Sequence, residues 1–238
     1  MDRRDFLKTA ATVAALAPLA KFAGKLEAAE PKDGATGLKV TRRRYRNTDM
    51  TLPLLGFGLM RLPQKNGQVD YATAEKMVDL AMDAGCNYFD TAYMYHGGES
   101  EKFVGKVLTK YPRESYYLTS KMPIVMMSGE ADNERIFREQ LARTRAGYFD
   151  FYFLHWLNEK HWEMAQRFKT LEFMKRMQKE GKIRRLGFSF HGEPETLKKI
   201  AGAYPWDLVQ IQLNYLDWEL CRSGEQYELL TKLGIPVR

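Results

Sequence analysis

Hydrophobic residues follow two patterns that alternate from about residue 45 to the end of the chain. Short runs rich in apolar and aromatic residues are separated by longer segments in which apolar residues recur every three to four positions. Runs of the first kind are typical of buried strands, and segments of the second kind are typical of amphipathic helices. The predicted strands are 54–59, 87–90, 116–120, 149–155, 184–189 and 208–213, and 235–238 begins a seventh. The predicted helices are 71–84, 100–108, 133–145, 162–179, 195–203 and 225–233.

The regular alternation of strands and helices predicts an α/β fold built around a parallel sheet. The run Phe149-Asp150-Phe151-Tyr152-Phe153-Leu154 is mostly apolar on both faces, as expected of a strand covered on both sides. An open doubly wound sheet is one solution, but the turn Gly56-Phe57-Gly58-Leu59-Met60-Arg61 lacks the third glycine of the dinucleotide-binding fingerprint. We therefore expect a (β/α)8 TIM-type barrel, incomplete in this chain, with about six strands and the start of a seventh.

The first residues have the pattern of an export signal. A basic start is followed by an uncharged run, and Arg3-Arg4-Asp5-Phe6-Leu7-Lys8 resembles the twin-arginine signal of bacteria. An amphipathic terminal helix is the alternative, and the cleavage site is left open. We assign residues 1–30 to the signal segment, 31–44 to a linker and 45–238 to the partial barrel. The twin-arginine export machinery is an expected partner, with a periplasmic or membrane-associated location.

Composition narrows the chemistry that the chain can supply by itself. Hydrophobic residues make up 45% and charged residues 28% of the 238 positions, which is ordinary for a globular protein. The net charge of +7 is modest, and no basic stripe interleaved with aromatic residues indicates nucleic acid as a partner. Cys86 and Cys221 form no Cys-x-x-Cys motif, so we expect no metal site in this chain. Any redox chemistry would then come from a bound organic cofactor.

Four titratable residues stand at or just beyond the ends of three successive predicted strands. They are Asp90 and Tyr95 after the second strand, Lys121 after the third and His155 at the end of the fourth. In a parallel barrel the carboxyl ends of the strands share one rim, where catalytic groups gather. Each residue alone is more often structural, as a helix cap, a packed ring, a solvated cation or a core histidine. Their convergence on one rim favours a catalytic site.

A chemical role follows for each of the four residues. A phenol that donates a proton near neutral pH needs a close cation, and Lys121 can supply that charge. Asp90 would pair with the Lys121 ammonium and compensate its burial. His155 would donate a hydrogen bond that orients a substrate carbonyl, and Tyr95 would be the proton donor.

The motifs around these residues resemble the aldo/keto reductases. The similarity extends from about Tyr45 to the end of the chain. It is carried by Asp90-Thr91-Ala92-Tyr93-Met94-Tyr95-His96-Gly97-Gly98-Glu99-Ser100-Glu101, Thr119-Ser120-Lys121 and Phe153-Leu154-His155. The resemblance implies an (α/β)8 barrel that transfers a hydride from NADPH or NADH to an aldehyde or ketone. It also implies that Asp90, Tyr95, Lys121 and His155 form a catalytic tetrad.

The same resemblance implies where the cofactor binds. In the family, a serine after the fifth strand and a glutamine on the sixth hold the nicotinamide carboxamide. The corresponding residues in this sequence are Ser189 and Gln210. Gly58 in the first strand–helix turn is a further expected cofactor contact. Phe190 stands where the family has an asparagine, and His191 is the candidate to replace it.

Two motifs are closer to a bacterial subgroup whose barrel carries a carboxy-terminal ferredoxin-like domain and whose members often bear a twin-arginine leader. They are Ser189-Phe190-His191 and Tyr95-His96-Gly97-Gly98-Glu99-Ser100-Glu101. This relation implies a C-terminally truncated chain, an iron–sulfur cluster only in the missing extension, and a redox partner. We expect an exported carbonyl-reducing oxidoreductase. The alternatives are a cofactor-bearing or electron-relay protein without turnover, and an inactive fragment.

Overall fold

Six parallel strands form the central sheet of the unit from Gly37 to Arg238, and they lie side by side in sequence order. They are β3 (Phe57–Gly58), β6 (Tyr88–Asp90), β7 (Tyr117–Met122), β8 (Phe149–Leu157), β9 (Ile183–Phe190) and β10 (Leu208–Ile211). Two hairpins stand outside this sheet, β1 (Arg42–Arg44) with β2 (Thr51–Pro53) and β4 (Gln64–Lys65) with β5 (Gln68–Val69). The structure is a computed structural model that describes residues 37–46, 48 and 50–238, so the predicted signal segment 1–30 lies outside the described residues.

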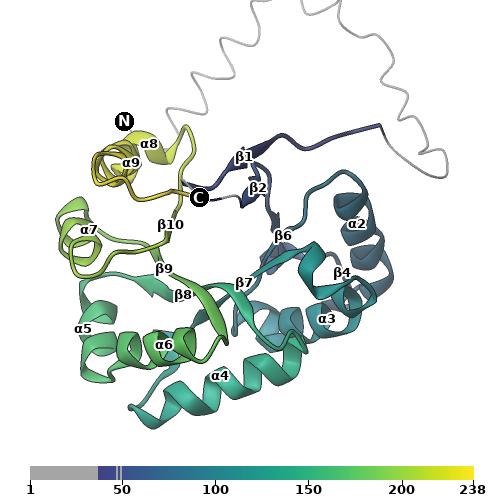
Figure 1. The fold of residues 1–238 in the computed structure, drawn as a ribbon, viewed down its shortest axis with the longest axis horizontal. Helices are drawn as coiled ribbons and strands as arrows, with labels where there is room; N and C mark the ends of the chain where they lie inside the picture. Colours follow the sequence, from purple (N-terminus) through teal and green to yellow (C-terminus); the bar gives the residue numbers. More distant parts are fainter. Residues whose placement is uncertain (1–36, 47, 49) are drawn as a thin grey trace, which may run out of the picture. The chain divides into compact units, whose positions relative to one another are not determined.

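Helices follow the strands and lie along the outer side of the curled sheet (Figure 1). They are α2 (Tyr71–Asp83), α3 (Glu99–Val107), α4 (Ala131–Thr144), α5 (Glu159–Arg167), α6 (Thr170–Lys179), α7 (Pro194–Ala201), α8 (Asp217–Leu220) and α9 (Ser223–Lys232). Short 3-10 turns are η2 (Leu59–Arg61), η3 (Tyr95–Gly98), η4 (Leu108–Lys110), η5 (Arg113–Ser115) and η6 (Ile124–Met126). A curled parallel sheet with an outer layer of helices confirms the predicted barrel-type α/β fold.

The alternation of side chains along β8 separates two packing layers. Phe151 and Phe153 face the inside of the curl, where they pack with Tyr88 of β6. Tyr152 and Leu154 point the other way, into the larger core between the sheet and the helices. Both faces of β8 are therefore buried, which accounts for the run of apolar residues in its sequence.

The hairpin of β1 and β2 was not predicted from the sequence. Residues 42–44 are strand β1, so assigning them to the linker 31–44 is wrong. All three arginines of β1 are exposed, and three exposed charges in a row leave no apolar alternation to indicate a strand. Tyr45 follows directly and packs edge-on against Phe151, with ring centroids 5.8 Å apart. The hairpin thereby covers the inner packing layer.

The single predicted helix 162–179 is wrong, because the structure has two helices there. α5 ends at Arg167, and Lys169 adopts a left-handed backbone conformation with φ 50° before α6 begins. The side-chain amide of Asn133 on α4 donates to the carbonyl oxygen of Phe168 at 2.8 Å. That contact satisfies one of the carbonyl groups that a helix end leaves without a partner.

The two edges of the sheet differ from each other. The first strand, predicted at 54–59, is reduced to β3, because only two of its residues pair with β6. At the other edge Val237 bridges Val209 of β10 in parallel, and the Arg238 amide donates to the Val209 carbonyl oxygen at 2.9 Å. The start of a seventh strand is therefore present. Within the described part of the chain, no helix has both the length and the apolar character needed to cross a bilayer.

Candidate active site

Three of the predicted site residues occupy inward-facing positions near the carboxyl ends of neighbouring strands. Asp90 ends β6, Lys121 lies near the end of β7 and His155 lies near the end of β8. Asp90 and His155 each come two residues after a side chain of the inner layer, and Lys121 comes two residues after Thr119, whose hydroxyl contacts Tyr88 of that layer. The pleat therefore turns all three to the same side. Tyr95 belongs to η3, in the connection that follows β6. The structure thus brings together the four residues that the sequence placed on one rim.

The Lys121 ammonium is the centre of this cluster. It donates to the Asp90 carboxylate, to the Thr91 carbonyl oxygen at 2.9 Å and to the Tyr95 hydroxyl oxygen at 3.4 Å. Its side chain is only 1% exposed. Burial works against the positive charge, but Asp90 and Tyr95 outweigh it and raise the pKa of Lys121 above its ordinary value. The group is therefore an ammonium that faces the Tyr95 hydroxyl.

His155 completes the cluster as a neutral ring. It packs edge-on against Tyr95 with ring centroids 5.8 Å apart and is almost completely buried. Burial, and then the charge of Lys121, lower the pKa of His155 to about 3. Its Nδ1 atom has no hydrogen-bond partner among the described residues. A neutral imidazole has one N–H, so His155 can donate a single hydrogen bond near neutral pH.

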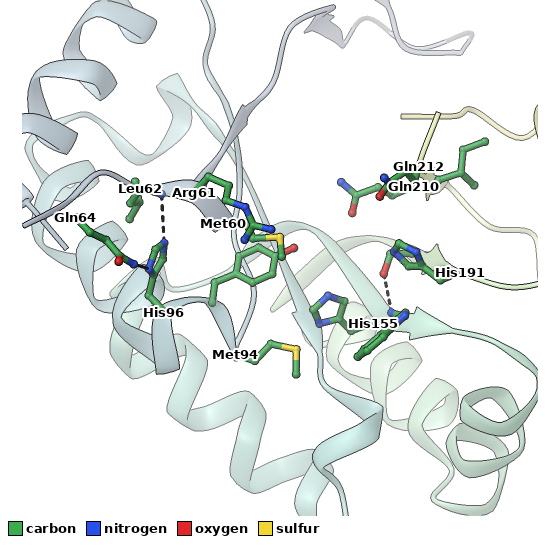
Figure 2. A pocket seen from close by; sticks show the side chains of 14 residues that line it. Met60, Arg61, Leu62, Gln64, Met94, His96, His155, His191, Gln210 and Gln212 are labelled. Atoms are coloured by element: carbon green, nitrogen blue, oxygen red, sulfur yellow. Dashed lines mark hydrogen bonds between the residues drawn. The ribbon is translucent and has the colours of Figure 1, made fainter. Parts of the chain in front are cut away.

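A pocket of about 1030 Å³ opens beside these residues (Figure 2). Tyr95 and His155 lie in its wall, whereas Asp90 and Lys121 lie behind Tyr95, outside the lining. The other lining residues are Met60, Arg61, Leu62, Gln64, Met94, His96, Trp156, Ser189, His191, Gln210, Ile211 and Gln212. Tyr95 and His155 are therefore the two members of the cluster that a molecule in the pocket can reach.

The three predicted cofactor contacts differ in their placement. Ser189, at the end of β9, and Gln210, on β10, both line the pocket. Gln210 also donates through Nε2 to Asp90 Oδ2 at 3.3 Å, which links the far edge of the sheet to the Lys121 cluster. Gly58 lies on β3 beside Asp90 and is exposed, but it is not part of the pocket lining.

Trp156 forms a rigid part of the pocket wall. Its backbone is left-handed, with φ 57°, at an irregularity in the pairing of β8 with β9. The Trp156 amide donates to Ser189 Oγ at 2.7 Å, and its carbonyl oxygen lies 2.6 Å from Nδ1 of His161. Trp156 lines the pocket, whereas Trp162 is buried in the core.

The residues after Ser189 divide between core and pocket. Phe190 is 1% exposed and packs with Phe188, so it does not reach the pocket. His191 lies in the pocket lining, in the position where a replacement for the family asparagine was expected. The ring of His191 is close to that of Trp156, with centroids 6.3 Å apart.

His96 is a pocket residue that the sequence did not single out. The Leu62 amide donates to His96 Nε2 at 3.2 Å, and the side-chain amide of Gln64 lies 2.9 Å from Nδ1 (Figure 2). These contacts join the turn that carries Tyr95 to the turn η2 after β3. The position of His96 directly after Tyr95 was the one signal in the sequence that could have pointed to a pocket role. Its partners, Leu62 and Gln64, lie more than thirty residues away in the sequence.

Glu101 is a second residue that the sequence analysis did not assign. It is fully buried on α3, and its carboxylate accepts hydrogen bonds from Ser120 Oγ and Gln140 Nε2, both at 2.7 Å. Burial raises the pKa of Glu101 above its ordinary value. Gln140 also donates to the carbonyl oxygen of Lys121 at 3.1 Å. This network holds the end of β7 from the helical side and so fixes the backbone that carries Lys121.

The geometry suits a carbonyl group bound in the pocket. A hydroxyl hydrogen, with an ammonium behind it, and an imidazole N–H can both approach one carbonyl oxygen. Among the described residues no group of three histidine, cysteine, aspartate or glutamate side chains is arranged to hold a metal ion.

Comparison with known proteins gives a consistent result. A sequence profile of the aldo/keto reductase family matches residues 54–237. A probable aldo-keto reductase of Glycine max is 27% identical over 192 residues, which are 77% of this chain and 54% of that protein. An NADH-specific methylglyoxal reductase of Escherichia coli is 27% identical over 212 residues, covering 80% of this chain and 64% of that protein.

Solved structures of similar proteins agree. The holo form of an aldo-keto reductase from Bacillus halodurans has a TM-score of 0.69 at 26% identity, over 83% of this chain and 65% of that one. An aldo-keto reductase from Klebsiella pneumoniae in complex with NADPH has a TM-score of 0.64 at 26% identity, over 79% and 63%. The chain spans between one half and two thirds of the length of these relatives.

Proposed function

This chain belongs to the aldo/keto reductase family, and we propose that it reduces aldehydes or ketones with a nicotinamide cofactor. The observation that carries the proposal is the contact between the Tyr95 hydroxyl and the buried Lys121 ammonium, beside the neutral ring of His155. Similarity to an NADH-specific reductase and to a reductase solved with NADPH supports either form of the cofactor.

Ser189 and Gln210 fit the carboxamide end of a nicotinamide. Ser189 Oγ accepts from the Trp156 amide and keeps its own hydroxyl hydrogen for a further acceptor. Gln210 uses one of its amide hydrogens on Asp90 and keeps the other, together with its carbonyl oxygen. Both residues line the pocket that Tyr95 faces. The bound cofactor would supply the hydride for the carbonyl carbon.

The side chains of the protein would then donate the proton to the carbonyl oxygen. His155 donates a hydrogen bond that holds the carbonyl oxygen next to Tyr95. The Tyr95 hydroxyl gives its proton to that oxygen as negative charge develops there. The Lys121 ammonium stabilises the tyrosinate that remains, and Asp90 keeps the ammonium in place. The product alcohol leaves, and Tyr95 regains a proton from solvent.

Replacing the hydroxyl of Tyr95 tests this proposal. We expect Tyr95→Phe to lower turnover of methylglyoxal by about 10²- to 10⁴-fold, because the proton donor is lost while the ring still packs. NADPH affinity, measured by fluorescence titration, should stay close to that of the parent protein. The matched control is Tyr93→Phe, because the Tyr93 hydroxyl bonds Glu139 on α4 outside the pocket. Equal NADPH oxidation by parent and Tyr95→Phe would show that Tyr95 is not the acid.

The proposal includes a location outside the cytoplasm, reached by the twin-arginine route. It rests on Arg3-Arg4-Asp5-Phe6-Leu7-Lys8, which lie outside the described residues. We expect Arg3→Lys with Arg4→Lys to retain the protein in the cytoplasm, because the receptor is expected to recognise paired guanidinium groups rather than charge alone. Cell fractionation measures this, with Arg43→Lys and Arg44→Lys in the exposed strand β1 as the matched control. Export of the first double variant at the parent level would contradict this route.

A relation to the subgroup with a ferredoxin-like domain is also part of the proposal and rests on Ser189-Phe190-His191 and the motif Tyr95–Glu101. An exported reductase needs either a tightly bound cofactor or another electron donor, since free NADPH belongs to the cytoplasm. This favours an electron-relay protein as the second candidate. Steady-state oxidation of many equivalents of NADPH supports the enzyme, whereas a single equivalent supports the relay.

A further inference from the structure

The charges around the pocket are strongly one-sided. Among the described residues that line it there is no aspartate or glutamate, and Arg61 is the one with a permanent positive charge. The carboxylate just behind the wall, Asp90, is paired with Lys121. Burial lowers the pKa values of His155 and His191, so both rings are neutral near pH 7. Among the described residues that line the pocket, a ligand therefore meets one fixed positive charge and no carboxylate, and the Asp217 carboxylate lies outside the lining near His191.

Arg61 is held by a rigid stretch of backbone. It is the last residue of η2, between Leu59 and Leu62, which are 0% and 5% exposed. The hydrogen bond from the Leu62 amide to His96 ties this stretch to the turn that carries Tyr95. The backbone position of Arg61 is thereby fixed relative to Tyr95.

The guanidinium of Arg61 is available to a ligand. It takes part in no hydrogen bond or ion pair with the described residues, and the residue is exposed. In Figure 2 the side chain extends into the pocket beside Met60. A guanidinium presents a planar fork of N–H donors that matches the oxygens of a carboxylate or phosphate.

We propose that Arg61 is a specificity-determining residue that selects carbonyl substrates carrying an anionic group, a carboxylate or a phosphate. This rests on the proposed function, because it takes the pocket beside Tyr95 as the substrate site. The reacting carbonyl lies between Tyr95 and His155, and the anionic group lies toward η2. Trp156 and Met60 also line the pocket, so the substrate body between the two groups can be apolar.

Matched pairs of probes test the inference in the absence of turnover. One pair is 4-carboxybenzaldehyde and its methyl ester, and the other is glyceraldehyde 3-phosphate and glyceraldehyde. Affinities are measured by calorimetry on the full chain without NADPH, at low and high salt. We expect the parent to prefer the anionic member of at least one pair, with a preference that falls at high salt. The pair with the larger preference identifies carboxylate or phosphate as the recognised group.

Variants of Arg61 assign the preference to this side chain. In Arg61→Gln the ratio of anionic to neutral affinity should fall on the order of 10- to 100-fold, the size expected for a charge-assisted pair of hydrogen bonds. Arg61→Lys should recover part of it. Arg138→Gln, on the outer helix α4, removes an exposed arginine with a surface ion pair and should keep the parent ratio.

The outcomes separate the inference from the proposed function. An unchanged ratio in Arg61→Gln overturns the inference, even if the chain reduces aldehydes. A loss of NADPH affinity in Arg61→Gln as large as the loss for the anionic probe also overturns it, because Arg61 would then hold the cofactor. A preference that depends on Arg61 in a chain that never oxidises NADPH supports the anion site and rejects the reductase.

Discussion

The neutral state of His155 makes the stability of the folded chain sensitive to acid. Its pKa is about 3 in the folded chain, chiefly because the ring is buried and then because Lys121 lies nearby. An exposed histidine titrates near 6.5. Between these pH values the unfolded chain binds a proton that the folded chain does not, so the free energy of unfolding rises with pH. The stabilising contribution is complete above pH 6.5 and is lost as the pH falls toward 3.

Removing the ring of His155 should remove this part of the acid sensitivity. Between pH 7 and pH 5 we expect the parent to lose about 2 kcal/mol more unfolding free energy than His155→Gln, which is 1.5 pH units at about 1.4 kcal/mol each. Urea unfolding at the two pH values measures the difference. Carboxylates with lowered pKa values, such as Asp79, titrate in both proteins. Their contributions to the pH dependence therefore cancel when the two proteins are compared. Identical losses in the two proteins would mean that the ring is protonated or solvated in the folded chain.

The sequence could place the four rim residues because their positions depend on local rules. The rule that the carboxyl ends of parallel strands share one rim was enough to put Asp90, Lys121 and His155 together. The pocket role of Trp156 depends instead on an irregularity between β8 and β9 and on a hydrogen bond to Ser189. Such contacts join residues far apart in the chain, and no local pattern encodes them.

Helices α3 and α4 cross closely at Gly105. A Cβ atom there would lie well inside the van der Waals radius of the Arg143 carbonyl oxygen, which is backbone and cannot turn away. The close approach brings Glu101 of α3 within hydrogen-bond distance of Gln140 on α4, whose amide also holds the Lys121 carbonyl. The packing of α3 against α4 therefore helps to hold the backbone of Lys121 in place.

Adding one methyl group at this crossing should separate the two helices. We expect Gly105→Ala to lower the unfolding free energy by about 1–3 kcal/mol, the usual cost of overpacking a tight core. The matched control is Gly129→Ala, because a Cβ atom there meets nothing within 4 Å. Urea unfolding of both variants measures the effect. A Gly105→Ala protein as stable as Gly129→Ala would show that the crossing is looser than the structure has it.

The elements show the same division between local and long-range information. Strand–helix alternation predicted the six-stranded sheet and most of its helices from apolar spacing alone. The break between α5 and α6 was not predictable in this way, because apolar positions continue across it. At the break the Phe168 carbonyl oxygen accepts a hydrogen bond from Asn133 of α4, a residue 35 positions earlier in the chain. The hairpin of β1 and β2 pairs a charged segment with an apolar one. Neither strand shows the alternation of apolar and polar residues that would indicate a strand.

Contacts of the β1–β2 hairpin join the beginning and the end of the described fold. The Tyr45 hydroxyl donates to the Asp207 carbonyl oxygen, and the Arg46 guanidinium donates to the Trp206 carbonyl oxygen at 2.6 Å. Asp207 directly precedes β10, so these contacts connect segments about 160 residues apart. Tyr45 is 6% exposed and burial raises its pKa to about 12, as expected of a ring that belongs to the inner layer.

If these contacts make the hairpin and β10 one cooperative unit, truncating Tyr45 should destabilise the whole sheet. We expect Tyr45→Ala to lower the unfolding free energy by about 3–5 kcal/mol, as for other buried aromatic residues, with a single transition in urea. Tyr45→Phe keeps the ring and should cost about 1 kcal/mol for the lost hydrogen bond. The control is Tyr227→Ala on α9, where the side chain is 40% exposed and about 0.5 kcal/mol or less is expected.

Hydrogen exchange distinguishes cooperative from local loss. In Tyr45→Ala the amides of β10 should exchange faster in step with the fall in global stability, because β10 has lost the contact that ties it to the hairpin. In Tyr227→Ala they should keep the parent rates. If Tyr45→Ala instead unfolds in two transitions, with β10 still protected after the first, the hairpin is a separate unit. The inner layer of the sheet would then be stable without it.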